Sequence, residues 1–114
     1  MGNKRYGSAH SIQRWRVFLG GIAVAHYTAR RFAQAVEYTS EALRLRPGFQ
    51  GAQRLRCASL AQAGRVDEAR DFLAVVRQHQ AQVSTDWVRE NVPYQTPALM
   101  KLFLDGLRKA GLDK

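Results

Sequence analysis

A short segment recurs in this chain after 34 residues, and the recurrence constrains the fold more than any other feature. Arg31-Phe32-Ala33-Gln34-Ala35 returns as Arg65-Val66-Asp67-Glu68-Ala69. Each copy follows one helical run and opens the next, and a 34-residue period with this content is typical of arrays of paired helices. The sequence therefore predicts an all-α fold built from helical hairpins.

Apolar residues at spacings of three and four predict about six helices and no strand. The expected ranges are about 11–29, 32–46, 49–63 and 67–80, then a short helix carrying Trp87 and Val88, and a final helix from Pro97 to about residue 110. Pro47-Gly48 should end the second helix, because proline cannot continue a helix. Gly64 should end the third in a left-handed conformation, and Thr96 should cap the last.

A glycine doublet, Gly20-Gly21, lies inside the first predicted helix. Each glycine costs a helix roughly 1 kcal/mol relative to alanine. We expect another helix to approach closely at this point, because tight antiparallel helix pairs need small residues.

Small residues recur where paired helices would cross. Ala23 and Cys57 take this position in the first helices, Ala35, Ala69, Ala42 and Val76 take it in the second helices, Phe32 and Val66 open the second helices, and Pro47 closes the first unit. Over about residues 12–81 this pattern resembles the tetratricopeptide repeat family. The resemblance implies two antiparallel helix pairs in a right-handed superhelix, at residues 11–47 and 48–83, after a basic segment at 1–10.

The second repeat departs from the family pattern. Arg56 stands where the pattern has a buried leucine, and Ala81 where a second proline would stand. We therefore expect the first helix of this repeat to be rotated so that Leu55, not Arg56, faces inward.

Residues 84–114 are predicted to form a helical cap. Two repeats are fewer than the three or so that normally bury a continuous core, so we expect the apolar stripe of the final helix to cover the open end of the fourth helix. The tail is also similar to the ends of bacterial multidomain proteins in which such repeats follow a nucleotide-cyclase domain or a winged-helix regulator. This second resemblance implies a detached accessory module of a cyclase-like or transcriptional signalling system.

Catalytic and metal-site patterns are absent from the sequence. The three histidines, His10, His26 and His79, have no second ligand type at helical spacing, and no glycine-rich phosphate loop occurs. We expect His26 to pack as a buried aromatic residue and Cys57 to serve as a small apolar filler. The sequence thus predicts no enzyme, no metal and no cofactor.

Binding is the remaining function, and the resemblance implies where it would occur. In tetratricopeptide repeats the first helices line a concave groove. The residues placed there by this resemblance are Val24, Tyr27 and Thr28 from the first repeat and Arg54, Ala58, Ala61 and Gln62 from the second. The lysine and asparagine set with which some relatives clamp a terminal carboxylate is missing, and Arg54 alone could pair with an acidic group.

A second candidate surface is the outer face of the first predicted helix. Trp15, Phe18 and Ile22 would form an apolar patch there if no repeat precedes them. Either the segment up to His10 folds over this patch, or two copies of the chain form a homodimer through it.

The charge leaves another binding function open. The chain carries a net charge of +9, and no acidic residue precedes Glu37. A basic N-terminal third could bind nucleic acid or an anionic surface, although arginines spread over nearly every helix also describe an ordinary solvated surface. No long apolar segment and no secretory signal stretch occur, so either the chain stays in the cytoplasm, which we expect, or a signal has been removed. The function expected first is that of a protein-interaction scaffold in the bacterial cytoplasm.

Overall fold

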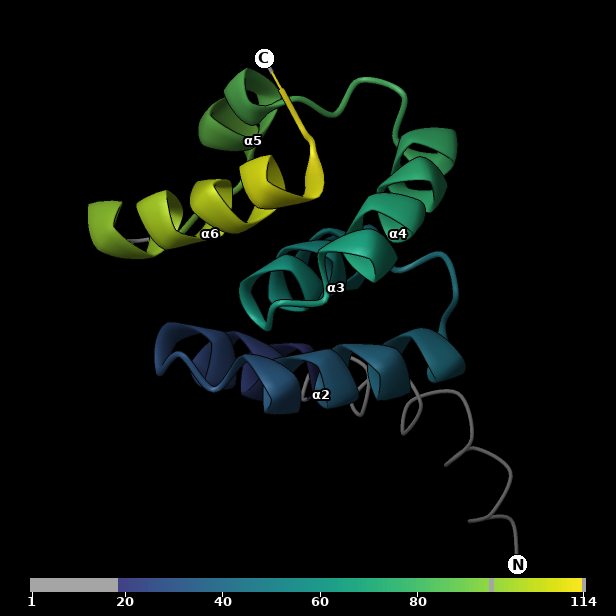
Figure 1. Cartoon of the computed structure of the whole chain (residues 1–114), viewed down its shortest axis with the longest axis vertical. Helices are drawn as coiled ribbons and strands as arrows, with labels where there is room; N and C mark the ends of the chain where they lie inside the picture. The colour runs from purple at the N-terminus through teal and green to yellow at the C-terminus, as the bar shows by residue number, and fades with distance from the viewer. Residues whose placement is uncertain (1–18, 95, 114) are drawn as a thin grey trace, which may run out of the picture.

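The computed structural model describes residues 19–94 and 96–113 and is built from helices and short connections (Figure 1). Residues 19–28 are helical and are called the first helix below. The others are α2 (Phe32–Leu45), α3 (Gln50–Gln62), α4 (Val66–His79), α5 (Thr85–Asn91) and α6 (Pro97–Ala110). No strand occurs in either described range. The predicted all-α fold is confirmed.

The turns inside the two helix pairs have the same backbone geometry. Arg30 and Gly64, 34 residues apart, both adopt positive φ, at 63° and 85°. The next amide in each copy reaches back five residues, from Arg31 to the His26 carbonyl at 2.8 Å and from Arg65 to the Leu60 carbonyl at 2.9 Å. The 34-residue recurrence therefore marks two copies of one helix-turn-helix unit.

Small residues let the paired helices cross closely. Ala23, Ala35, Ala42, Cys57, Ala69 and Val76 are all buried. In the second pair the contact is close enough for the Cys57 thiol to donate to the Ala69 carbonyl at 3.5 Å. Phe32 and Val66 are half-buried where the second helices begin, and Pro47 and Gly64 lie exposed in the turns.

As expected from the sequence of the second repeat, α3 turns Leu55 toward the core instead of Arg56. Leu55 is buried with 3% of its surface exposed. Arg56 is half-buried, and its guanidinium carbon lies 5.0 Å from the centroid of the Phe72 ring. An arginine can take this place because its aliphatic stem packs like an apolar side chain and its head stacks on an aromatic face.

The position of α6 corrects the expectation for the cap. The helix packs mainly against α3 and only lightly against α4, with α5 on its other side (Figure 1). Its ends are as expected: the Thr96 hydroxyl accepts from the Leu99 amide at 3.1 Å, and Gly111 closes the helix at φ 113°. The apolar stripe of α6 thus covers the side of α3 instead of the end of α4.

No described helix crosses the first helix at the glycine doublet. A Cβ on Gly20 would lie 3.5 Å from the Phe49 ring, and a Cβ on Gly21 would have no described atom within 4 Å. Among the described residues, what approaches Gly20 is therefore one aromatic side chain at ordinary contact distance, and none approaches Gly21.

Candidate functional site

The first helix and α3 provide the face on which a binding groove was expected, and α6 covers much of it. The Tyr27 hydroxyl donates to the Leu102 carbonyl of α6 at 2.6 Å, and the Gln62 amide donates to the same carbonyl at 3.1 Å. Tyr27 is fully buried, and burial raises the pKa of its phenol. The neutral phenol remains a donor at physiological pH, so these bonds fix α6 across the two repeats.

Gly106 is the point of closest approach between α6 and α3. A Cβ at this position would lie 2.9 Å from the Cβ of Ala58 and 2.6 Å from the Tyr27 hydroxyl oxygen. Only glycine admits two helix backbones at such a distance. Ala58 and Ala61 are buried.

The seven residues predicted to line the groove therefore differ in their exposure and contacts. Tyr27, Ala58 and Ala61 do not line an open groove, because α6 occupies that space. Gln62 is half-buried and accepts from the Lys109 ammonium at 2.7 Å, and Thr28 is exposed, its hydroxyl donating to the Val24 carbonyl at 2.8 Å. Of the seven predicted residues, Val24 and Arg54 line one pocket together.

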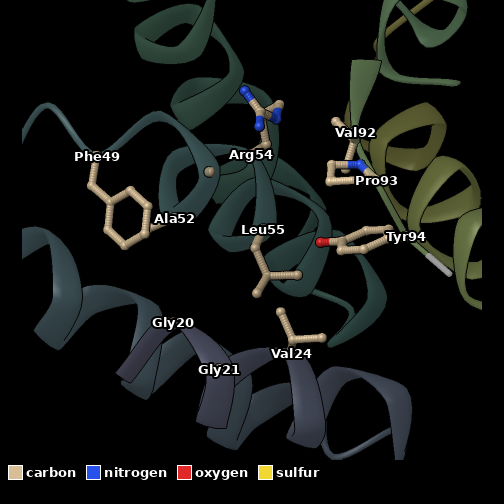
Figure 2. Close-up of a pocket in the computed structure, with 11 residues that line it drawn as sticks. Gly20, Gly21, Val24, Phe49, Ala52, Arg54, Leu55, Val92, Pro93 and Tyr94 are labelled. Atoms are coloured by element: carbon tan, nitrogen blue, oxygen red, sulfur yellow. The ribbon is translucent and has the colours of Figure 1, made fainter. Parts of the chain in front are cut away.

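That pocket, here called the Arg54 pocket, has a volume of about 390 Å³. Its walls come from the first helix, the start of α3 and the connection between α5 and α6. They are formed by Gly20, Gly21, Val24, Phe49, Gly51, Ala52, Arg54, Leu55, Val92, Pro93 and Tyr94 (Figure 2). The volume lies in the lower part of the range for ligand pockets. Most of the lining is apolar, and Arg54 is its charged member.

Arg54 is held in place by neutral partners. Its Nη1 donates to the Gln80 side-chain carbonyl at 2.7 Å, and its guanidinium carbon lies 5.3 Å from the centroid of the Trp87 ring. Gln80 is fully buried and also donates to the side chain of Gln53 at 3.0 Å, which anchors it. Burial lowers the pKa of the Arg54 guanidinium, but arginine stays protonated at physiological pH. The pocket therefore contains a fixed, partly desolvated positive charge.

Tyr94 is the other polar side chain of the pocket wall. Its ring packs edge-on against the Phe103 ring with the centroids 5.0 Å apart, and its hydroxyl points toward the pocket (Figure 2). Burial raises the pKa of Tyr94 to about 12, so its hydroxyl is a neutral donor near pH 7. Sequence reasoning missed Tyr94, Val92 and Pro93, because the connection that carries them lies outside the repeats.

A shallower depression of about 240 Å³ lies between α3 and α4. It is lined by Arg56, Leu60, Glu68, Asp71, Phe72 and Val75. Acidic and basic side chains share this surface, and Glu68 already accepts from Arg65 at 2.7 Å. It therefore offers less charge selectivity than the Arg54 pocket.

Cysteine and histidine often act in catalysis, and in this structure Cys57 and His26 pack against neighbouring side chains or backbone. Burial raises the pKa of the Cys57 thiol to about 12, which disfavours the reactive thiolate. His26 is half-buried, stacks on Tyr38 with ring centroids 5.1 Å apart and accepts from Arg31 at 3.0 Å. Within the described ranges, no three His, Cys, Asp or Glu side chains gather closely enough to hold a metal ion.

The proposed self-association face lies mostly outside the described residues. This applies to Trp15 and Phe18, and to the basic segment at 1–10. Ile22 is half-buried in the first helix. Homodimer formation through these three residues stays a prediction, which light scattering on a size-exclusion column would test.

Acidic side chains neutralise part of the basic surface. Six ion pairs join residues three or four positions apart on α2, on α6 or around α4 and α5: Arg44–Glu41, Arg65–Glu68, Arg70–Asp67, Arg89–Asp86, Lys101–Asp105 and Arg108–Asp105. All are substantially exposed, so each contributes little to stability. Arg54 has no ion pair among the described residues.

Comparison with known proteins agrees with this geometry. The family model for the tetratricopeptide repeat matches residues 26–87, which is more than half of the chain. The chain belongs to the tetratricopeptide repeat family. Tetratricopeptide repeats are generally non-catalytic modules that bind protein partners. No match was found among curated proteins or solved structures.

The family match begins at His26, near the end of the first helix, spans α2, α3 and α4 and reaches Trp87, but it does not extend to α6. The helix that fills the concave face of these tetratricopeptide repeats thus comes from outside the matched region. No described helix has the length and apolar character needed to cross a membrane.

Proposed function

We propose that this chain is a non-catalytic protein-interaction module that holds a segment of a partner protein in the Arg54 pocket. Membership of the tetratricopeptide repeat family supports the general role. The observation that carries the choice of surface is the placement of α6. Because α6 occupies the concave face beside Tyr27 and Ala58, the Arg54 pocket is where that face can still receive a partner.

A substitution that fills the pocket tests this function. Gly21 is exposed and helical, and a Cβ there would meet no described atom within 4 Å, so Gly21→Leu should occupy the pocket without disturbing the core. Ala74→Leu is the matched control, because Ala74 is exposed on α4, away from the pocket. Proteins captured from native lysate should be lost with Gly21→Leu and retained with Ala74→Leu. Equal capture by both variants would refute the proposed surface.

The net charge of +9 favours a second candidate, binding to nucleic acid or an anionic surface. The observed ion pairs weaken that candidate, because five carboxylates lie beside six of the basic side chains. Binding that depends on released counterions would weaken steeply between low and moderate salt. Such a salt dependence for a nucleic acid, retained in Gly21→Leu, would favour this alternative over the pocket.

The expected role in a bacterial cyclase-like or transcriptional system rests on the resemblance of the tail, and the cytoplasmic location stays a separate prediction. Co-purification with a cyclase or winged-helix domain would support it. A partner from an unrelated process would leave the interaction function intact and remove this specific role.

A further inference from the structure

We propose that the Arg54 pocket recognises an extended, internal segment of a partner protein that carries an aspartate or glutamate side chain beside an apolar residue. This inference rests on the proposed function and specifies the occupant of the same pocket. The carboxylate would lie between Arg54 and the start of α3, and the apolar side chain would lie over Gly20 and Gly21. The pocket residues support each half of this assignment separately.

The charge of the pocket favours an acidic group. Arg54 is the charged residue in the lining, and none of the described ion pairs includes it. Its Nη1 is bound to Gln80, and its Nε is buried without an acceptor among the described residues. A cation held by neutral partners is suited to a carboxylate, which would accept a charge-assisted hydrogen bond from the guanidinium.

The start of α3 adds positive potential on the same side. Gly51, in the first turn of α3, lines the pocket, and a Cβ there would lie 3.9 Å from Nη2 of Arg54. This helix has no side-chain cap and no acidic residue in its first turn. Free amides at a helix start attract negative charge. Together with Arg54, they favour an anionic occupant on this side of the pocket.

The glycine doublet explains the apolar half. Glycine is unfavourable inside a helix compared with alanine, yet the packing of the described residues does not require it here. A Cβ on Gly20 would make an ordinary contact of 3.5 Å with Phe49, and a Cβ on Gly21 would meet no described atom within 4 Å. The doublet instead leaves room beside Val24 and Leu55 for an apolar side chain of the partner.

The small number of polar groups favours a side-chain carboxylate over a free chain end. Arg54 and Tyr94 are the polar side chains of the lining. Capture of a terminal carboxylate depends on several donors that converge on it. One guanidinium and one phenol match a single aspartate or glutamate better, and the flanking backbone can then continue out of the pocket on both sides.

The test uses random nonapeptides displayed between fixed linkers, so that neither end is free, and selected on the full chain. Sequences with aspartate or glutamate next to a leucine, isoleucine, valine or phenylalanine should be enriched. The enriched peptide, acetylated and amidated, is then measured by fluorescence anisotropy beside its Glu→Gln or Asp→Asn version. Loss of the carboxylate should weaken binding roughly ten- to hundredfold, the range for a charge-assisted hydrogen bond.

Variants of the chain complete a double-mutant cycle. Arg54→Gln should weaken binding of the acidic peptide as much as the peptide substitution does, and should change binding of the neutral peptide little. Arg46→Gln removes the same charge from an exposed position at the end of α2, outside the pocket, and should leave binding unchanged. Circular dichroism melting of each variant shows whether the fold is intact, and Gly21→Leu should abolish binding without lowering the melting temperature.

The outcomes separate the occupant from the general function. If the Gly21→Leu variant loses peptide binding but the Arg54→Gln variant binds the peptides normally, the proposal of an acidic occupant is overturned. The pocket would then still be an interaction site. Selection of no sequence, a requirement for a free C-terminus, or a preference for phosphorylated peptides would also overturn it. Full binding by Gly21→Leu would refute the pocket as an interface, and both proposals would fail together.

Discussion

At the scale of single residues, Arg30 and Gly64 show that the same turn geometry forms with an arginine in one repeat and a glycine in the other. Both adopt left-handed φ at equivalent places in the two repeats. The sequence predicted this conformation at Gly64, because glycine commonly ends helices there. It gave no such signal at Arg30, where the repeat imposes the conformation on a residue that disfavours it. A strict comparison of the two copies, position by position, would have identified it.

Replacing Arg30 by glycine should stabilise the protein. Left-handed backbone costs a residue with a Cβ roughly 1–2 kcal/mol, and the greater freedom of glycine in the unfolded chain offsets about 0.5–1 kcal/mol of the gain. We expect a net increase of up to about 1 kcal/mol in the free energy of unfolding, measured by urea denaturation. Arg46→Gly is the control, because Arg46 has extended backbone at φ −144° and should lose stability. A loss at both positions would show that Arg30 is not strained.

Two glycines in helices should respond in opposite directions to alanine. Gly106→Ala places a Cβ 2.9 Å from Ala58 and 2.6 Å from the Tyr27 hydroxyl, so overpacking should cost about 1–3 kcal/mol. Gly21→Ala would meet no described atom within 4 Å and should gain about 0.5–1 kcal/mol from helix propensity. Chemical denaturation of the two variants compares them directly. If Gly106→Ala is as stable as the parent protein, α6 does not pack as described.

The buried thiol of Cys57 should make stability fall in alkaline solution. An unfolded cysteine ionises near pH 8.5, whereas burial raises the pKa of Cys57 to about 12. Below pH 8.5 the thiol is neutral in both states. Above it, the unfolded state alone loses the proton, and the free energy of unfolding falls by about 1.4 kcal/mol per pH unit until the folded pKa is reached.

The measurement compares the full chain with Cys57→Ala in denaturant titrations from pH 8 to pH 11. The alanine variant lacks the thiol, so its free energy of unfolding should fall by about 3 kcal/mol less than that of the full chain across this interval. Parallel pH dependences would show that the thiol is accessible in the folded state.

At the scale of elements, the sequence identified each described helix but not the neighbour of the last one. The stripe containing Leu99, Phe103 and Leu107 indicates that α6 buries one face, and the caps at Thr96 and Gly111 mark its ends. A stripe does not specify what covers it. The neighbour is decided by Gly106 against Ala58 and by Tyr27 against Leu102, contacts between residues far apart in the chain. No periodicity in the sequence records such pairs.

Because α6 belongs to the core, it should unfold together with the repeats. Phe103, Leu107 and Ala110 have at most 1% of their surface exposed. Their amide hydrogens should exchange as slowly as those of Leu55 and Leu60 in α3, at rates governed by global unfolding. Hydrogen exchange followed by mass spectrometry or NMR measures this. Fast exchange throughout α6, with α3 still protected, would identify it as a detachable cap.

At the scale of the whole molecule, the site was predictable in part. Val24 and Arg54 were expected on a binding surface, and both line the pocket. Val92, Pro93 and Tyr94 were not, because their contribution depends on how α6 returns across the repeats. The expectation that Tyr27, Ala58 and Ala61 line an open groove was wrong, because no pattern in the sequence indicates that α6 lies over this face. The division at 11–47, 48–83 and 84–114 stays a prediction.

The measurement that tests the central claim most directly is the nuclear Overhauser contact between the α protons of Gly106 and the methyl group of Ala58. The account predicts a strong contact in the full chain, because a Cβ on Gly106 would lie only 2.9 Å from that methyl carbon. A strong contact would place α6 in the concave face and leave the Arg54 pocket beside it. Absence of the contact, with Cys57 still seen beside Ala69, would mean that the concave face is open and that the partner binds elsewhere on it.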